Sequence, residues 1–188
     1  NNRLSIKLFG HLTTPDSGLL VQTSKSPSGS SEDIDLDAIA EFVIEEMRPD
    51  LIYILGPGST VGRIARRMRI EKTLLGVDAV KGDGTLLGKD VDESSLLSLI
   101  NKGPGKIIIS PIGGQGFLFG RGNQQISPEV IRRVGTENVT VVAAKSKLEG
   151  LHPRRLLVDS GDEEIDGKLR GYTRVITGYR EEMVIKVE

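Results

Sequence analysis

The sequence of 188 residues is long enough to bury a hydrophobic core, and its 25 basic residues nearly balance its 26 acidic ones, which argues against binding nucleic acid or membranes through net charge. It contains no Cys, which excludes disulfides, Cys-based zinc sites and thiol catalysis. No apolar run approaches the roughly 20 residues of a membrane helix, so we expect a soluble, cytoplasmic protein. Because the sequence begins with Asn1 rather than Met, we also expect a piece of a longer chain.

Two strands, a loop and a helix are predicted before residue 50. The alternating pattern at residues 4–8 and the apolar run at 19–22 are typical of strands. Residues 24–31 are rich in Ser, Pro and Gly and are predicted to form a mobile loop. A helix is predicted at residues 34–47, because its start is acidic, its apolar residues follow helical spacing and Pro49 follows it.

After residue 50, nearly continuous apolar strands alternate with helices. The strands predicted at residues 51–55, 106–110 and 139–143 have the composition of strands buried on both faces of a parallel sheet. Helices are predicted between them, at residues 61–68, at 93–100 and from Ser127 and Pro128 onward.

Antiparallel strands are predicted beside this alternating pattern. Residues 73–80 and 86–91 are predicted to pair as a hairpin, and strands at 173–176 and 183–187 close the chain. The sequence therefore predicts a single α/β domain over residues 1–188. Its sheet is mostly parallel and flanked by helices, with antiparallel strands added at the N- and C-terminal ends.

A Gly-rich turn at residues 56–60 follows one predicted buried strand and precedes a helix. Backbone N–H groups at a helix start attract anions, and glycines let a phosphate approach the backbone. We therefore predict a phosphate site that Arg63 could reach, formed by Gly56, Gly58, Ser59 and Thr60. The alternative is a tight turn before a helix whose arginines form a solvated basic face, namely Arg63, Arg66 and Arg67.

A second Gly-rich segment follows the predicted strand at residues 106–110. So many glycines would cost too much backbone entropy for a simple connection, and the polar side chains among them suit phosphate, ribose or a nucleotide base. The alternative is an irregular loop that satisfies its own backbone groups. The predicted ligand residues are Gly113, Gly114, Gln115, Gly116, Gly120, Arg121, Gly122, Asn123, Gln124 and Gln125.

Both Gly-rich segments follow predicted parallel strands, so they are expected at the same edge of the sheet. Ligands of open parallel sheets bind at the carboxyl ends of the strands. Asp78, at the end of an apolar run, is a further candidate for this edge.

Three other polar features are assigned structural roles. Gly82-Asp83-Gly84-Thr85 matches part of a kinase phosphate-binding motif, but a strand pattern follows it, which favours a hairpin turn. The acidic residues at 159–166 could bind Mg²⁺, although a solvated loop with a helix N-cap is favoured. His11 and His152 share no metal-ligand spacing.

The segments at residues 53–60, 73–78 and 110–128 resemble the C-terminal half of the ATP-NAD kinase-like proteins of archaea and bacteria. Residues 158–162 and 169–179 extend the resemblance, which covers most of the chain from about residue 41. Its most specific part is Gly-Gly-Gln-Gly…Gly-Arg-Gly-Asn-Gln-Gln, at residues 113–125.

The resemblance implies phosphoryl transfer from ATP or polyphosphate to the 2′-hydroxyl of the adenosine ribose of NAD, with Mg²⁺, yielding NADP. In NAD kinases the catalytic Asp lies in a Gly-Gly-Asp-Gly-Thr motif of an N-terminal domain, which is not found in this sequence. We therefore expect the chain to be the C-terminal lobe, able to bind ligand without turnover and able to form a homo-oligomer. No catalytic residue is assigned.

Two other functions are compatible with the sequence. A sugar-phosphate isomerase also places a Gly-Ser-Thr turn after a strand, but its acid/base pair cannot be assigned here. A non-catalytic domain that senses a nucleotide and regulates a partner would use the same Gly-rich turns.

Overall fold

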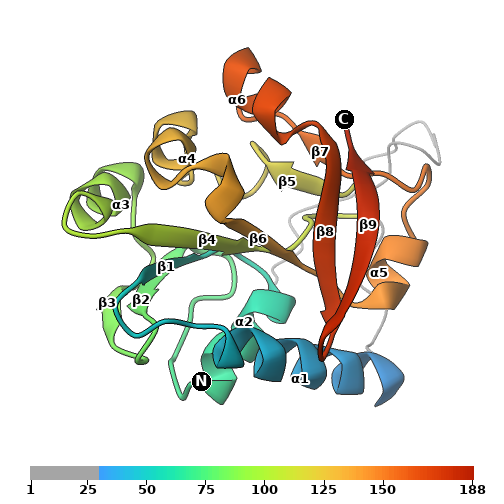
Figure 1. Ribbon diagram of the computed structural model, residues 1–188, viewed down its shortest axis with the longest axis horizontal. Helices are drawn as coiled ribbons and strands as arrows, with labels where there is room; N and C mark the ends of the chain where they lie inside the picture. Colours follow the sequence, from blue (N-terminus) through green and yellow to red (C-terminus); the bar gives the residue numbers. More distant parts are fainter. Residues whose placement is uncertain (1–29) are drawn as a thin grey trace, which may run out of the picture.

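Seven strands form the central sheet in the computed structural model, which describes residues 30–188. Their order across the sheet is β3 (Leu86–Gly88), β2 (Asp78–Lys81), β1 (Ile52–Leu55), β4 (Gly105–Ile109), β6 (Val139–Val142), β8 (Gly171–Gly178) and β9 (Glu181–Val187). Two short strands, β5 (Phe117–Phe119) and β7 (Leu157–Val158), form a separate parallel pair (Figure 1).

The four central strands of the sheet, β1, β4, β6 and β8, pair in parallel. The strands at both edges are antiparallel, because β2 and β3 form a hairpin beside β1 and β9 folds back on β8. This arrangement confirms the predicted fold class. The predicted strands at residues 4–8 and 19–22 lie outside the described residues, as does most of the predicted loop at 24–31.

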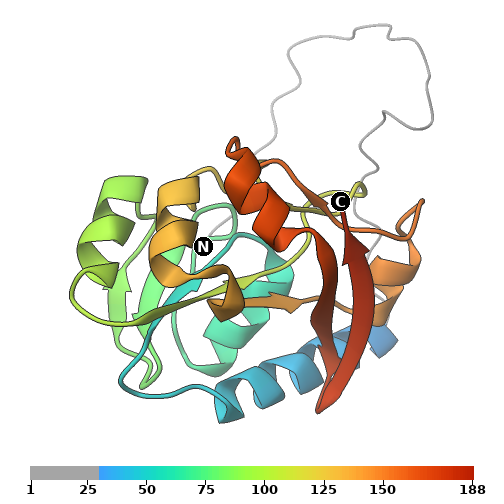
Figure 2. The ribbon, with the colours of Figure 1, turned by 45° about the horizontal axis from the view of Figure 1, so that its top comes forward.

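Helices cover both faces of the sheet (Figures 1 and 2). Helices α1 (Ser30–Glu45) and α2 (Ser59–Arg67) pack on one face. Because α1 begins at Ser30, the last two residues of the predicted loop at 24–31 are helical. Helices α3 (Glu93–Ile100), α4 (Pro128–Val134) and α6 (Glu163–Leu169) lie on the other face. The remaining helices are α5 (Lys145–Glu149), after β6, and the 3-10 helix η1 (Thr136–Asn138). None of the described helices has the length and apolar composition needed to cross a membrane.

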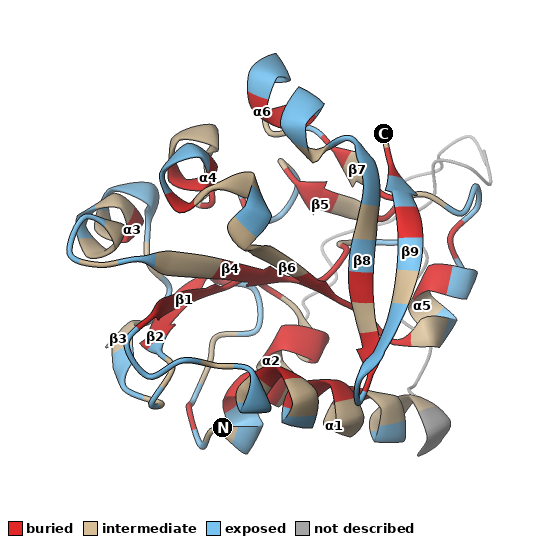
Figure 3. Cartoon of the chain, in the orientation of Figure 1, coloured by how far each residue is buried: buried red, intermediate tan, exposed pale blue. Residues whose placement is uncertain are grey.

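Alternating side chains of the central strands enter two separate hydrophobic cores. In β1, Ile54 packs with residues of α3 and α4, whereas Leu55 packs with residues of α1 and α2. Every residue of β1 is buried, as Figure 3 shows. Burial of each such side chain contributes about 1.5–3 kcal/mol, which explains why these strands are nearly continuous apolar runs.

The structure confirms the predicted helix start at Ser127 and the predicted hairpin turn at residues 82–84. The hydroxyl of Ser127 accepts a hydrogen bond from the Val130 amide at 3.3 Å, and Pro128 is the first residue of α4. The turn at Gly82-Asp83-Gly84 joins β2 to β3, and the Thr85 amide donates to the Asp83 carboxylate at 2.8 Å. The interpretation of this motif as a hairpin turn is therefore confirmed.

The predicted strand at residues 73–80 is wrong in its first half. Strand β2 begins at Asp78, and the preceding residues form a loop that folds back on that side chain. Both the amide and the hydroxyl of Thr73 donate to the Asp78 carboxylate, at 2.7 and 3.0 Å. These bonds take the place of a strand ladder, because a carboxylate can hold the backbone in a turn.

Lys72 and Asp78 form an ion pair inside this loop. The Lys72 ammonium lies 3.6 Å from the Asp78 carboxylate, and the two side chains are 2% and 0% exposed. The ammonium also donates to the carbonyls of Thr73 and Gly76, at 2.7 and 3.0 Å. Burial lowers the pKa of Lys72, and the charge of Asp78 opposes that shift. The pair fixes the loop from within.

Replacing Asp78 by Ala should lower the free energy of unfolding by about 3–5 kcal/mol, because it leaves the Lys72 ammonium buried without a counter-charge. Asp83→Ala is the control, since this exposed carboxylate makes a local turn bond, and it should cost about 1 kcal/mol. Urea unfolding followed by circular dichroism measures both values. Equal costs for the two variants would contradict a structural role for the ion pair.

Candidate functional site

The carboxyl ends of β1, β4 and β6 meet at one side of the sheet, here called the carboxyl edge. It comprises residues 56–60 after β1, 110–116 after β4 and 143–147 after β6. The Gly56 amide donates to the Ile108 carbonyl at 2.9 Å, which places the turn after β1 directly beside the end of β4. The two Gly-rich segments are therefore neighbours where they leave the sheet, as their sequence positions predict.

The two glycines of the first turn have different structural roles. A Cβ atom at Gly56 would lie 2.9 Å from the side chain of Ile109, so this glycine allows β1 and β4 to pack closely. Gly58 has a φ of 106°, and a Cβ atom there would meet nothing within 4 Å. Its conformation favours glycine and leaves space beside the backbone, which is where a ligand would approach.

Helix α2 begins at Ser59, directly after Gly58. Its N-cap residue, Gly58, has no side chain to cap the helix, as is also true of Ala144 before α5, whereas α3, α4 and α6 are capped by Asp92, Ser127 and Asp162. Ser59 is partly exposed, and Thr60 is buried. The start of α2 therefore has the backbone geometry of an anion site.

The arginines of α2 contact α1. Arg63 pairs with the carboxylate of Asp33 and lies 3.3 Å from that of Asp37. Arg67 pairs with Glu41 at 2.9 Å. These ion pairs hold the two helices together, so Arg63 is not directed at the start of its own helix.

Residues 113–116 form the tip of a hairpin. Ile112 and Phe117 exchange two backbone hydrogen bonds, of 2.7 and 3.3 Å, across the four residues Gly113, Gly114, Gln115 and Gly116. The first three are exposed, and Gly113 and Gly116 have positive φ values of 65° and 77°. The tip thus presents backbone groups to solvent beside the carboxyl edge.

The second half of this Gly-rich segment packs against its own loop and against the residue after β7. A Cβ atom at Gly120 would overlap the carbonyl oxygen of Asp159. A Cβ atom added at Gly122 would lie 3.5 Å from the side chain of Ile112. The amide nitrogen of the buried Asn123 side chain donates to the Leu118 carbonyl at 2.7 Å. These contacts are those of a self-supporting loop.

The four polar side chains of this half differ in their exposure to solvent. Arg121 is 60% exposed, lies 3.6 Å from the Asp159 carboxylate and stacks 4.4 Å from the Phe117 ring. Gln124 is exposed and Gln125 is partly buried. The side-chain oxygen of Asn123 is buried and has no hydrogen-bond partner among the described residues. Arg121 and Gln124 are therefore the members of this group that a ligand could contact directly.

Asp78 lies at the same end of the sheet, because it pairs with Leu55 at the end of β1. Its carboxylate accepts hydrogen bonds from Thr73 and from the Asp90 amide; the bond from Asp90 is 2.6 Å long. The same carboxylate lies beside the Lys72 ammonium. The structure therefore places Asp78 beneath the candidate site as a support for the loop at residues 72–77.

Two further contacts at the carboxyl edge are absent from the predicted set. The Lys147 ammonium donates to the buried Ser110 hydroxyl at 3.3 Å, joining α5 to the end of β4. The Leu74 carbonyl accepts from the Gly58 amide at 2.8 Å, so the loop before β2 lies beside the start of α2. The position of Lys147 after the third parallel strand is the sequence signal that could have identified it.

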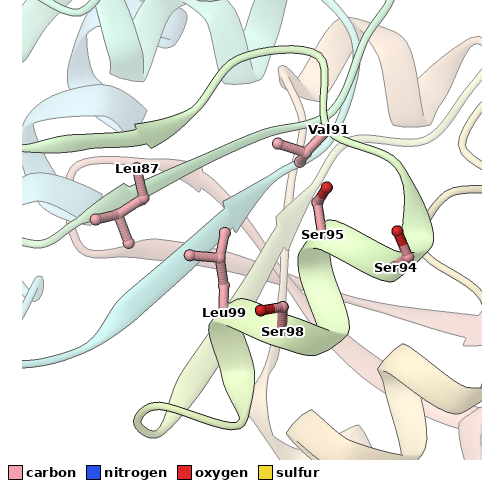
Figure 4. Close-up of a pocket in the computed structure, with 6 residues that line it drawn as sticks. All are labelled: Leu87, Val91, Ser94, Ser95, Ser98 and Leu99. Carbon is pink, nitrogen blue, oxygen red and sulfur yellow. The ribbon is translucent and has the colours of Figure 1, made fainter.

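Two shallow grooves occur among the described residues, and none of the predicted site residues lines either of them. One, of about 340 Å³, lies between α3 and the β3 hairpin; in Figure 4 its Leu99, Ser95 and Ser98 side chains extend from α3 toward Leu87 and Val91. The other, of about 250 Å³, lies at the amino ends of β6 and β8, between Val139 and Tyr172. The predicted site is thus an edge of backbone turns outside these two hollows.

The acidic residues at 159–166 serve the start of α6. The Asp162 carboxylate accepts from the amides of Glu164 and Ile165, at 3.0 and 3.1 Å, and the bond from Ile165 lowers the pKa of Asp162. Asp166 accepts from the Ser160 amide at 3.1 Å. The predicted N-cap is confirmed. The part of the chain that the structure describes holds no group of three or more His, Asp or Glu side chains placed to bind a metal.

Comparison with protein families gives one match. The family model described as the ATP-NAD kinase C-terminal domain matches residues 48–187. The chain belongs to this family. The match confirms the resemblance predicted from residues 53–60 and 110–128 and includes the whole carboxyl edge. Searches of curated proteins and of solved structures found no match.

Gly120→Ala should lower the free energy of unfolding by at least about 2 kcal/mol, because a methyl group would overlap Asp159 in a backbone conformation that favours glycine. Gly167→Ala in α6 is the matched control: a Cβ atom there meets nothing, and Ala should add up to about 1 kcal/mol of stability. Denaturant unfolding measures both variants. An unchanged free energy of unfolding in Gly120→Ala would show that the close approach of residue 120 to Asp159 does not contribute to stability.

Proposed function

We propose that this chain is the nucleotide-binding lobe of an NAD kinase-like phosphotransferase, which transfers a phosphoryl group from ATP or polyphosphate to NAD and so produces NADP. The observation that carries the proposal is the position of both Gly-rich segments at one carboxyl edge, in a member of the ATP-NAD kinase C-terminal domain family. In open parallel sheets this edge is where ligands bind.

The residues of the edge suggest a division of roles. The backbone N–H groups at the start of α2 would hold a phosphate, with Ser59 beside them; the Gly58 amide itself is bonded to the Leu74 carbonyl. The exposed tip at residues 113–115 would close over the ligand. Arg121 would supply a positive charge and a planar guanidinium suited to phosphate oxygens.

Mg²⁺ and the catalytic base would come from outside this set of residues. The described residues lack a carboxylate cluster for a metal, so Mg²⁺ would be carried chiefly by the phosphates of the nucleotide, as is common for this ion. The oxygens of Asp78 are occupied by the Lys72 loop, so it is not assigned as the base. We propose that an N-terminal domain supplies the Asp that accepts the proton of the ribose hydroxyl.

Binding to this chain should be detectable without turnover. Thermal unfolding measured with ATP, NAD, NADP, polyphosphate or ribose 5-phosphate should show stabilisation by the nucleotides, about 2.7 kcal/mol at a hundredfold excess over Kd. Arg121→Ala should weaken nucleotide binding about tenfold, because a charge-assisted contact is lost. Arg174→Ala is the control, since this arginine is 79% exposed on β8.

The other outcomes separate the alternative functions. Stabilisation by ribose 5-phosphate alone would indicate a sugar-phosphate enzyme and would contradict the proposal. Nucleotide binding without NADP formation by the full-length protein would indicate a sensing domain. Stabilisation by none of these ligands would remove the basis for a phosphate site at the carboxyl edge.

A further inference from the structure

One end of the carboxyl edge is cationic and polar. Ser110 follows β4 directly, is 4% exposed and accepts a hydrogen bond from the Lys147 ammonium at 3.3 Å. Lys147 comes from α5, which follows β6. The buried hydroxyl thus positions a partly exposed ammonium at the carboxyl ends of two adjacent parallel strands, and an ammonium suits phosphate oxygens.

The neighbouring lysine on the same helix serves another purpose. Lys145 lies 2.7 Å from the carboxylate of Glu181, at the start of β9. Two lysines separated by one residue thus have different partners, and only Lys147 contacts a residue at the end of β4. This difference provides a matched control for any effect of charge on α5.

The other end of the edge is apolar. Leu74 and Leu75 are 44% and 70% exposed, although they lie in a loop fixed from within by the buried pair of Lys72 and Asp78. The bond from the Gly58 amide to the Leu74 carbonyl places them beside the start of α2. A rigid loop that holds two leucines in solvent is a feature of binding surfaces, because water contact with these side chains is unfavourable.

The strand order fixes how these features follow one another. β2, β1, β4 and β6 are successive neighbours, so the two leucines, the Gly58 turn, Ser110 and Lys147 occur in that order along the edge. Three spacings of about 4.8 Å give a width of about 14 Å. This width is on the scale of a nucleotide with its phosphate chain.

We infer that a nucleotide lies across the carboxyl edge in one direction, with its base on Leu74 and Leu75 and its terminal phosphates at the Lys147 ammonium, which Ser110 positions from below. This inference rests on the proposed function and adds the orientation of the ligand and the residues that set it. The Gly58 turn, between the two ends, then contacts the phosphate nearest the ribose.

Isothermal titration of the full chain with ADP and with inorganic tripolyphosphate tests the orientation. Lys147→Met should weaken the binding of both ligands about tenfold, because both place phosphates beside this ammonium. Leu75→Ser should weaken ADP about threefold or more and leave tripolyphosphate unchanged, because only ADP has a base. Lys145→Met and Leu86→Ser, which alters a 44% exposed leucine on edge strand β3, should change neither affinity.

Two results would overturn the inference while leaving the proposed function intact. One is unchanged tripolyphosphate binding by Lys147→Met in a chain that binds both ligands. The other is an equal loss of both ligands in Leu75→Ser with an unchanged melting temperature. If the unmodified chain binds neither ADP nor tripolyphosphate, the inference fails, and the proposed function fails with it when ATP, NAD and NADP also give no thermal stabilisation.

Discussion

The parallel pairing of β1, β4 and β6 is the constraint on which the arrangement of the candidate site depends. Hydrogen bonds from the Ile52 amide to the Pro104 carbonyl and from the Gly56 amide to the Ile108 carbonyl fix the register of β1 and β4, and both faces are buried along β1 and the last three residues of β4. Because parallel strands end on the same side, the segments that follow them must meet there. The helices on both faces are what make such a buried sheet possible.

The glycines of the edge divide into those that allow packing and those that leave space. Gly56 and Gly120 permit close approach to Ile109 and Asp159, so their role is accounted for inside the fold. Gly58 and Gly113 have positive φ values that favour glycine, but a Cβ atom at Gly58 would meet nothing within 4 Å, and residues 113–115 are exposed. We propose that a ligand approaches the backbone at these positions, in agreement with the family of this chain.

Most of the helices and strands could be predicted from the sequence because their signals are local. The apolar runs identified β1, β4 and β6, and Ser127 with Pro128 identified the start of α4. The loop before β2 could not be found this way, since it depends on the buried contact between Lys72 and Asp78. Strand order predicted that the two Gly-rich segments lie at the same end of the sheet, whereas the contact of Lys147 with Ser110 spans 37 positions and leaves no periodic pattern.

Hydrogen–deuterium exchange of the chain with and without saturating ATP or NAD tests most directly whether the carboxyl edge binds a nucleotide. Bound nucleotide should slow exchange at residues 56–60 and 110–116 and leave exchange unchanged in the grooves beside Leu99 and Tyr172. Slower exchange confined to either groove, with the edge unaffected, would contradict it.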